Sequence, residues 1–213
     1  MTTIYLTRHG ETDLNRAGIV QGRGVNAPLN ENGLIQAEAL RERLSNVWLD
    51  AVYCSPLLRA VQTAETVVRS HPYLNPRKMT DLEEISWGIC EGKRLDEVLR
   101  KAFDNVRLQW QNGDFEAKIS GGESASEVEK RAKRALMNIV SQHLGESVLI
   151  VTHGRFLRVL LAGILAGYGL SKMEQIKHTN TSLNVLTFDG KKFRAELLHD
   201  TLHLKHITHL VHS

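Results

Sequence analysis

The chain has 213 residues, of which 42% are hydrophobic and 24% charged, and its formal net charge is +3. This composition is ordinary for a globular protein, and the length suits one α/β domain with a substantial core. So small a charge gives no reason to expect nucleic acid or a membrane surface as a partner, and no apolar run is long enough to span a bilayer.

The chain enters a predicted strand almost at its start, which leaves no room for a signal peptide. It has two cysteines, Cys54 and Cys90, and neither has the spacing of a metal ligand. Cys54 falls in a predicted buried strand, so we interpret it as a structural thiol. We therefore expect a protein of the reducing cytoplasm.

Predicted strands and helices alternate along the chain, as in α/β proteins. The first predicted strand covers residues 4–7. Prolines at positions 72 and 76 end the predicted helix over 56–69, because two prolines cannot continue a helix, and Asp189-Gly190 is a hairpin signal near the end of the chain. In chain order the later elements are helix 31–46, strand 51–54, helix 56–69, extended segment 79–84, helices 95–110 and 124–143, strand 147–152, helix 156–166, and strands 183–189 and 192–198.

Two histidines follow directly on predicted buried strands. His9, preceded by Arg8, comes after the strand over residues 4–7, and His153 comes after the strand over 147–152. The carboxyl ends of parallel strands meet at one edge of a sheet, which is where open α/β proteins place their ligands. We therefore expect the two histidines to lie close together.

A third predicted strand, over residues 51–54, ends at Ser55-Pro56. Serine is a good helix N-cap and proline a good first helical residue, so a helix should begin here. Arg59 would then lie in the first turn of that helix, at the same edge of the sheet as His9 and His153.

This combination of side chains suits phosphoryl transfer. Histidine can act as a nucleophile near neutral pH, and the planar fork of arginine fits phosphate oxygens. His9 can attack only if the reacting nitrogen is unprotonated, and the cations Arg8 and Arg59 would lower its pKa. Its other ring nitrogen must then donate a hydrogen bond, and a backbone carbonyl is the expected acceptor. The alternative for Arg8-His9 taken alone is a strand end with two solvated polar residues.

The order and spacing of these motifs, from Ile4 to about Leu204, resemble the histidine phosphatases, also called the phosphoglycerate mutase-like superfamily. The matching segments are Arg8-His9-Gly10-Glu11-Thr12 with Asn15, Gln21-Gly22, Pro28-Leu29-Asn30-Glu31-Asn32-Gly33, Ser55-Pro56-Leu57-Leu58-Arg59-Ala60 with Gln62-Thr63-Ala64, Leu82-Glu83-Glu84-Ile85 with Gly88, Glu91-Gly92, Gly122-Glu123-Ser124, Thr152-His153-Gly154 and Thr201-Leu202-His203-Leu204.

The resemblance implies a fold of the α/β class, a three-layer α/β/α sandwich with a mostly parallel central sheet. Residues 1–213 would form a single domain, with a small helical cap at about 95–120. The implied activity is that of a histidine acid-type phosphatase, a phosphoric monoester hydrolase that acts through a phosphohistidine on a small phosphorylated metabolite. The family chemistry needs no metal and no cofactor, so the expected partner is a small-molecule phosphate ester.

The match also implies a set of site residues. The expected catalytic residues are His9, Glu84, His153, Arg8 and Arg59. The expected substrate-binding residues are Asn15, Gln21, Gly22, Gly154, Thr181 and Ser182.

Glu84 is the expected donor of a proton to the leaving oxygen. It occupies the glutamate position of a Leu-x-Glu-x-x-x-Gly pattern that runs from Leu82 to Gly88. Glu83 is the neighbouring rival, and we expect it to be a surface carboxylate. The alternative role for Glu84 is a salt bridge with a pocket arginine, because structural ion pairs often mimic sites.

Two alternatives to hydrolysis remain at this stage. A cofactor-dependent phosphoglycerate mutase is the nearer one, but the stretch over residues 95–121 is short and would leave the pocket open to water. A non-catalytic binding protein on the same fold is the other, although every core residue of the motif is present. The sequence does not identify the phosphate ester, and it allows a monomer or a homodimer.

Several charged residues carry two interpretations. Arg23 and Arg155 could bind a second anionic group of the substrate or be surface cations, with equal weight. We expect His178 to be a surface residue. The chain also ends in a run of histidines, for which a polar tail is favoured over a metal site. These are His199, His203, His206, His209 and His212.

Overall fold

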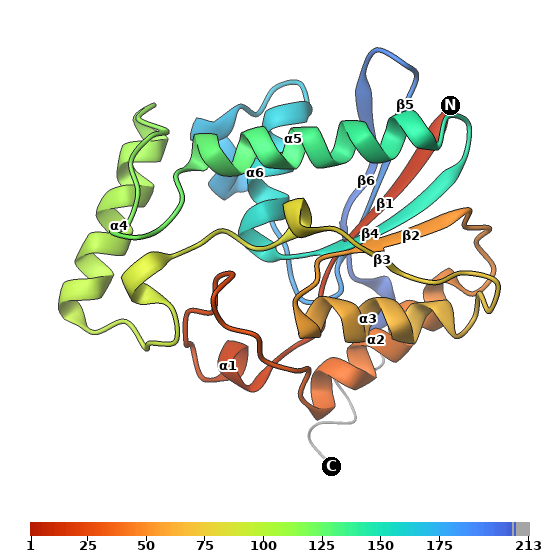
Figure 1. Cartoon of the computed structure of the whole chain (residues 1–213), viewed down its shortest axis with the longest axis horizontal. Helices are drawn as coiled ribbons and strands as arrows, with labels where there is room; N and C mark the ends of the chain where they lie inside the picture. Colours follow the sequence, from red (N-terminus) through yellow and green to blue (C-terminus); the bar gives the residue numbers. More distant parts are fainter. Residues whose placement is uncertain (206, 208–213) are drawn as a thin grey trace.

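The computed structural model describes residues 1–205 and 207, and a six-stranded sheet forms its centre (Figure 1). The strands stand in the order β3-β2-β4-β1-β5-β6, and only β5 runs against the others. The mostly parallel sheet predicted from the sequence is confirmed. The bounds are β1 Thr2–Arg8, β2 Ala51–Cys54, β3 Arg77–Lys78, β4 Ser147–Thr152, β5 Leu183–Phe188 and β6 Phe193–Asp200.

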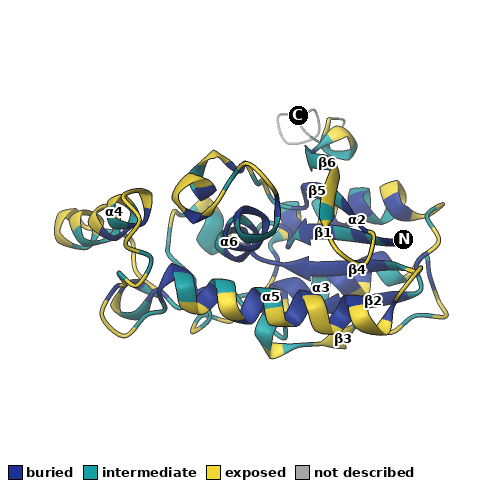
Figure 2. Cartoon of the chain, turned by 90° about the horizontal axis from the view of Figure 1, so that it is seen from above, coloured by how far each residue is buried: buried dark blue, intermediate teal, exposed yellow. Residues whose placement is uncertain are grey.

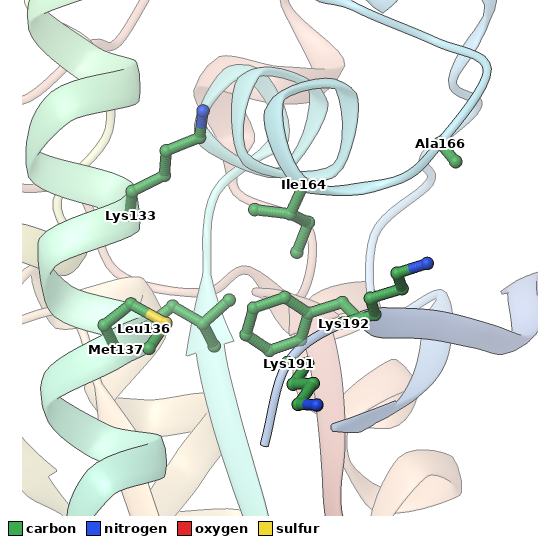
Figure 3. Close-up of a pocket in the computed structure, with 8 residues that line it drawn as sticks. Lys133, Leu136, Met137, Ile164, Ala166, Lys191 and Lys192 are labelled. Carbon is green, nitrogen blue, oxygen red and sulfur yellow. The ribbon is translucent and has the colours of Figure 1, made fainter. Parts of the chain in front are cut away.

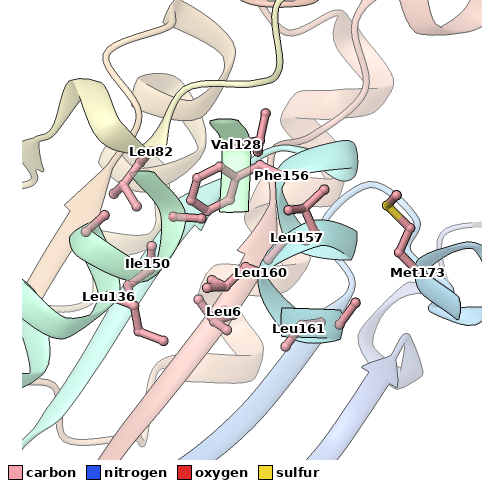
Figure 4. Packing of buried hydrophobic residues seen from close by; sticks show 14 of the residues in the cluster. Leu6, Leu82, Val128, Leu136, Ile150, Phe156, Leu157, Leu160, Leu161 and Met173 are labelled. Atoms are coloured by element: carbon pink, nitrogen blue, oxygen red, sulfur yellow. The ribbon is translucent and has the colours of Figure 1, made fainter. Parts of the chain in front are cut away.

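Helices cover both faces of the sheet, which gives the predicted three layers (Figure 2). Helices α2 (Glu31–Leu44) and α3 (Leu58–Val68) lie on one face, and α5 (Ala125–Gln142) and α6 (Gly154–Ile164) lie on the other (Figure 1). Each interface has its own cluster of buried apolar side chains. The larger cluster, under α5 and α6, is drawn in Figure 4.

The sequence pattern of the central strands explains this burial. Strand β4 is apolar at successive positions and β1 at alternate ones, and each is covered by helices on both sides. Leu6 of β1 and Ile150 of β4 are 0% and 1% exposed and pack beneath Phe156 and Leu160 of α6 (Figure 4). The free energy of burying such side chains, about 1.5–3 kcal/mol each, fixes how α6 lies on the sheet.

The remaining helices lie at the carboxyl edge of the sheet or beside it. Helix α1 (Asp13–Arg16) follows the first loop, and α4 (Glu97–Gln111) stands to one side of the layers (Figure 1). Within residues 1–205 and 207 there are also four short 3₁₀ turns, at Thr80–Leu82, Gly88–Cys90, Leu170–Gln175 and Leu202–Leu204. In the described part of the chain, no helix combines the length and apolarity needed to cross a membrane.

Two local predictions were wrong. The segment over residues 79–84 is not extended throughout: Met79 and Glu83 are extended, but a 3₁₀ turn at Thr80–Leu82 lies between them, and the pairing with β2 occurs earlier, at β3. Ser55 does not cap α3: the N-cap is Leu57, whose amide donates to Ser55 Oγ at 3.3 Å. The helix therefore begins at Leu58, and Arg59 still lies in its first turn.

Strand register brings the predicted residues to one edge. Arg8 pairs with Thr152 across β1 and β4, and Cys54 pairs with Val151 across β2 and β4. The next residues along the chain, His9, Ser55 and His153, therefore leave the sheet side by side. The division of the chain into one domain with a cap stays a prediction.

Candidate active site

Two histidines and an arginine form the buried centre of the site. His9, Arg59 and His153 are 3%, 1% and 0% exposed. The imidazole rings of His9 and His153 lie with their centroids 5.1 Å apart, tilted by 58°. Arg59 Nε donates to His9 Nε2 at 3.2 Å, while its two terminal nitrogens donate to the carbonyls of Val25 and Gly22. The convergence predicted from three strand ends is present.

The tautomer of His9 follows from its second ring nitrogen. Nδ1 lies 2.7 Å from the carbonyl oxygen of Gly10, so this nitrogen carries the proton and donates it. The lone pair is then on Nε2, which faces Arg59. The loop is held closely: the Gly10 amide donates to Thr63 Oγ1, and a Cβ on Gly10 would lie 2.5 Å from the carbonyl oxygen of Gly33. The backbone carbonyl that the sequence predicted as the acceptor for the second ring nitrogen of His9 is that of Gly10.

Burial and neighbouring cations keep these histidines neutral. Burial lowers the pKa of His9 well below its usual value, and the charges of Arg59 and then Arg8 lower it further. Burial and Arg59 do the same to the pKa of His153. Burial also lowers the pKa of Arg59, to about 10, so that arginine stays charged at neutral pH. An unprotonated His9 beside a fixed cation is the state that nucleophilic attack on phosphorus requires.

Several buried polar atoms of the site have no hydrogen-bond partner among the described residues. They are Arg8 Nε, Gln21 Oε1, both ring nitrogens of His153 and Thr181 Oγ1. Burying such groups unpaired costs free energy, so several of them near one cavity indicate a site built for a ligand. Most of these atoms can donate, and Arg8 and Arg59 add positive charge, so the ligand they fit is an anion.

A cavity of about 190 Å³ opens over this centre. Its size suits a small metabolite better than a large one. The polar part of the wall comes from the end of β1, the loop after it, α3 and Glu84, and the rest of the wall is apolar. The residues that line it are Arg8, His9, Asn15, Ile19, Val20, Gln21, Gly22, Arg59, Glu84, Trp87 and Phe103.

Glu84 lines the cavity and is held by backbone donors. Its Oε1 accepts from the amides of Ile85 and Phe156, at 3.0 and 2.9 Å, and its Oε2 accepts from the amide of Arg155 at 3.1 Å. Two of these amides belong to the first turn of α6, whose N-terminus favours a carboxylate. Within the described part of the chain Glu84 forms no salt bridge with a pocket arginine, the alternative role considered from the sequence, and its carboxylate is bound by backbone amides.

The family follows from comparison with known proteins. A model of the histidine phosphatase superfamily (branch 1) matches residues 4–201. The chain belongs to the histidine phosphatase superfamily. It is 33% identical over 208 residues to a metal-independent phosphoserine phosphatase of Arabidopsis thaliana, covering 97% of this chain and 85% of that one. It is 31% identical over 211 residues to a probable phosphoglycerate mutase GpmB of Yersinia pestis, covering 96% and 95%.

A solved structure agrees with these matches. Bacillus stearothermophilus YhfR superposes with a TM-score of 0.87 at 35% identity, over 96% of this chain and 100% of that one. The predicted family and fold are thereby confirmed, and the relatives support the predicted hydrolysis of phosphomonoesters, for which a phosphohistidine is the general mechanism of the family.

The predicted substrate-binding residues of this histidine phosphatase divide into two groups. Asn15, Gln21 and Gly22 line the cavity. Thr181 and Ser182 do not: the Thr181 amide donates to the Arg8 carbonyl, and the Ser182 hydroxyl bonds to the backbone of Thr179. Gly154, the first residue of α6, is also outside the lining. These three support the loop and helix that carry Arg8 and His153, and a direct role for them stays a prediction.

His178 belongs to the site, although the sequence predicted a surface residue. Its Nδ1 lies 3.3 Å from Arg8 Nη1 and accepts the hydrogen bond, because burial and the charge of Arg8 lower the His178 pKa to about 2. A Cβ on Gly154 would lie 2.5 Å from its ring, so that position requires glycine. His178 comes 24 residues after that glycine, and no motif links the two in the sequence.

Arg131 of α5 was also missed from the sequence. It is 7% exposed and donates to the carbonyls of Asp81, Glu83 and Glu84, and it forms an ion pair with Glu123 at 2.9 Å. These bonds set the path of the segment that presents the Glu84 carboxyl. Arginine on an amphipathic helix is usually solvated, so the sequence holds no signal for this role.

Arg23 and Arg155, which the sequence left as either substrate-binding or surface cations, both form ion pairs within the protein. Arg23 bonds to Glu83, through Nε at 2.9 Å, and to Glu123 at 3.4 Å. Glu83 is therefore a half-buried ion-pair partner, and the prediction of a surface carboxylate was wrong. Arg155 pairs with Glu174 and lies over the ring of Trp87, 5.6 Å from its centroid.

The histidine-rich end of the chain is only partly described. His203 Nε2 lies 3.1 Å from the Thr181 carbonyl, and His199, near the end of β6, departs from strand geometry with a φ of 55°. His206, His209 and His212 lie outside the described residues. Among residues 1–205 and 207, no three His, Cys, Asp or Glu side chains are placed to hold a metal ion.

The buried neutral histidines predict that stability depends on pH. His9, His153 and His178 have lowered pKa values in the folded protein, against about 6.5 in the unfolded chain. Below about pH 6.5 the unfolded chain binds these protons and the folded protein does not, so stability is full above that pH and falls as the pH drops. We expect the Tm to decrease from about pH 7.5 to about pH 5.5, and to decrease less in His178→Asn. A Tm independent of pH in this range would contradict the neutral state.

Proposed function

We propose that this histidine phosphatase hydrolyses a small phosphomonoester through a phosphohistidine on His9. The observation that carries the proposal is the state of the His9 ring: Nδ1 is bound to the Gly10 carbonyl, and the neutral Nε2 faces the cavity beside Arg59. Such a ring presents one lone pair to a phosphorus atom and cannot turn away from it.

In the first step, Nε2 of His9 forms a bond to phosphorus and the bond from phosphorus to the ester oxygen breaks. Arg8, Arg59 and His153 donate hydrogen bonds to the phosphoryl oxygens, where charge is concentrated in the transition state. Arg59 then exchanges its contact with His9 for one with the phosphoryl group, and the Nε2 lone pair becomes free. The fixed cations supply the positive charge that a metal supplies in other phosphatases.

Glu84 supplies the proton for the leaving oxygen, which makes the reaction that of a histidine acid-type phosphomonoesterase. In the second step Glu84 takes a proton from water, the water oxygen bonds to phosphorus, and the bond to Nε2 breaks. Phosphate leaves and His9 returns to its neutral state. Glu84 lines the same cavity as His9 and Arg59, which supports this role.

The wall beyond the phosphate site favours a leaving group without a second negative charge. It consists of Ile19, Val20, Trp87 and Phe103, and the rings of the last two lie 4.3 Å apart. The nearby cation Arg155 is already paired with Glu174. A carboxylate on the substrate would lose its hydration on entering the cavity without gaining a cation that has no other ion-pair partner. We therefore propose that phosphate esters of apolar or aromatic alcohols are better substrates here than phosphoserine or phosphoglycerate.

One panel of substrates tests the reaction and the leaving group together. We expect phosphate release from phenyl and 1-butyl phosphate with kcat/KM about tenfold or more above that for phosphoserine and 3-phosphoglycerate, since an unpaired buried charge costs more than about 1.4 kcal/mol. A higher value for the two carboxylate esters would contradict the proposed leaving group. No turnover of any ester would favour a non-catalytic binding protein.

The same samples distinguish a hydrolase from a mutase. With 3-phosphoglycerate and a trace of the 2,3-bisphosphate, we expect more free phosphate than 2-phosphoglycerate, because the single helix α4 leaves the cavity open to water. If interconversion exceeded phosphate release, the alternative of a cofactor-dependent mutase would replace our proposal.

We propose a cytoplasmic location, which the two free buried thiols Cys54 and Cys90 support. Burial raises the pKa of Cys54 to about 12.

A further inference from the structure

A groove runs along strand β6, away from the active site. It consists of three adjoining hollows of about 330, 220 and 230 Å³. The first and second share Ala166 and Phe193, and the second and third share Tyr168 and Leu198. We call the three together the β6 groove, and it shares no residue with the active-site cavity.

The floor of the groove is apolar. In the first hollow, Leu136 and Met137 of α5 face Ile164 at the end of α6 (Figure 3). Met137 is 46% exposed, and the ring of Phe193 is held in place by Phe188, with centroids 4.5 Å apart. Beyond Tyr168 the third hollow is more polar, since Gln175, Lys177 and His199 line it beside Ile176 and Leu198. Apolar side chains gathered in a hollow at the surface mark a site for a ligand with an apolar body.

Cations without partners stand at one end of the groove. Lys191 and Lys192 lie on the turn between β5 and β6, at the rim of the first hollow (Figure 3). Their backbone amides donate to Asp189 Oδ1, but within the described part of the chain neither ammonium has an ion-pair partner. Lys133, on the other side of the hollow, is paired with Glu129 at 2.8 Å. Among the described residues, Lys177 in the third hollow also has no ion-pair partner, so the groove has two unpaired lysines at the turn and one at its other end.

The shape of β6 argues against a protein as the occupant. The strand is at the edge of the sheet, but its pairing with β5 contains two register shifts, and irregular edges of this kind prevent a further strand from pairing. The apolar floor offers no groups for the backbone of a peptide, which must be satisfied when buried. A second copy of this chain would bring its own Lys191 and Lys192 against these.

We propose that the β6 groove binds the anion of a fatty acid, with the acyl chain along the floor and the carboxylate between Lys191 and Lys192. From Phe193 to Leu198 the strand rises by about 17 Å, at about 3.3 Å per residue, so the floor accommodates an extended chain of medium length. Such a ligand has no polar groups along its body and one negative charge at its end, which are the two properties that the groove combines.

The test is calorimetric titration of the full chain with decanoate, and with 1-decanol as the uncharged analogue. We expect decanoate to bind once per chain and 1-decanol to bind about tenfold more weakly. The double variant Lys191→Glu/Lys192→Glu should lose about tenfold or more in affinity, because it reverses the charge that meets the carboxylate. Ala166→Trp, at an exposed position in the wall, should prevent binding by filling the groove.

Lys78→Glu is the matched control, since Lys78 is an exposed lysine on β3, at the opposite edge of the sheet. Its affinity for decanoate should equal that of the unaltered chain, and all variants should hydrolyse phenyl phosphate normally. The proposal is overturned if decanoate does not bind, if Ala166→Trp binds it unchanged, or if Lys78→Glu weakens it as much as the double variant. Binding to phosphatidylglycerol vesicles but not to decanoate would indicate a membrane contact and would also overturn it.

Discussion

Replacement of His9 by alanine is expected to abolish turnover and leave the fold intact. His9 is the one ring in the site with a fixed tautomer and a lone pair facing the cavity. Removing a nucleophile typically costs a factor of about 10⁴ or more in kcat. Phosphate release from phenyl phosphate measures the loss, and thermal unfolding checks the fold. His71→Ala is the control, because His71 is equally buried, at 2% exposure, but lies after α3 and away from the cavity.

The covalent intermediate gives a second measurement of the same residue. During turnover of a ³²P-labelled ester, the unaltered chain should carry a label that is stable to base and labile to acid, as expected for phosphohistidine. His9→Ala should carry none, and His71→Ala should be labelled like the unaltered chain. If His9→Ala kept most of its activity, or kept the label, the nucleophile would be another group, of which His153 is the nearest.

The fold could be predicted from the sequence because its signals are local. Strands β2 and β4 are short apolar runs, and each is followed by a helix with an apolar face, α3 and α6. The antiparallel hairpin of β5 and β6 has a turn at Asp189-Gly190, and Gly190 adopts a φ of 94° that other residues rarely reach. The local pattern did not predict the 3₁₀ turn at Thr80–Leu82. There the Leu82 side chain is buried by packing against residues distant in the sequence.

The centre of the site was predictable for a related reason. His9 and His153 each follow a strand directly, and Arg59 lies in the first turn of the helix after β2, so the strand order brings the three together. His178 and Arg131 follow no such rule. Their contacts with Arg8 and with the backbone around Glu84 span 170 and 47 residues of sequence, and depend on how the last loop and α5 pack. Such contacts exist only in the folded protein.

Ion pairs were the least predictable part of the site. Glu174 binds Arg107 at 2.9 Å and also pairs with Arg155 and Arg158, which joins α4 to α6 through one carboxylate. These charges lower the Glu174 pKa to about 2. In the sequence these are ordinary surface residue types on three separate segments. Arg155 is held in this shared ion pair, so it would have to exchange its contact with Glu174 to meet a second anionic group of the substrate.

Glu84→Gln should lose activity in proportion to how poor the leaving group is. A general acid matters most for an alkoxide and least for a stabilised phenolate, so we expect a loss of about 10²–10⁴-fold on 1-butyl phosphate and a much smaller one on p-nitrophenyl phosphate. On the aryl ester phospho-His9 should accumulate, because hydrolysis of the intermediate still needs Glu84 as the base. Both effects follow if its carboxyl exchanges protons with substrate and water.

The contacts of Glu84 call for a control that separates chemistry from structure. Its carboxylate accepts from the amides of Ile85, Arg155 and Phe156, and glutamine would place an N–H group against one of these donors. A purely structural defect lowers the Tm and affects both esters equally, whereas loss of the acid affects the alkyl ester more. Glu83→Gln is the matched variant, since Glu83 bonds to Arg23 and does not line the cavity. If Glu83→Gln gave the leaving-group dependence and Glu84→Gln did not, the proton would be delivered from the neighbouring position in the chain.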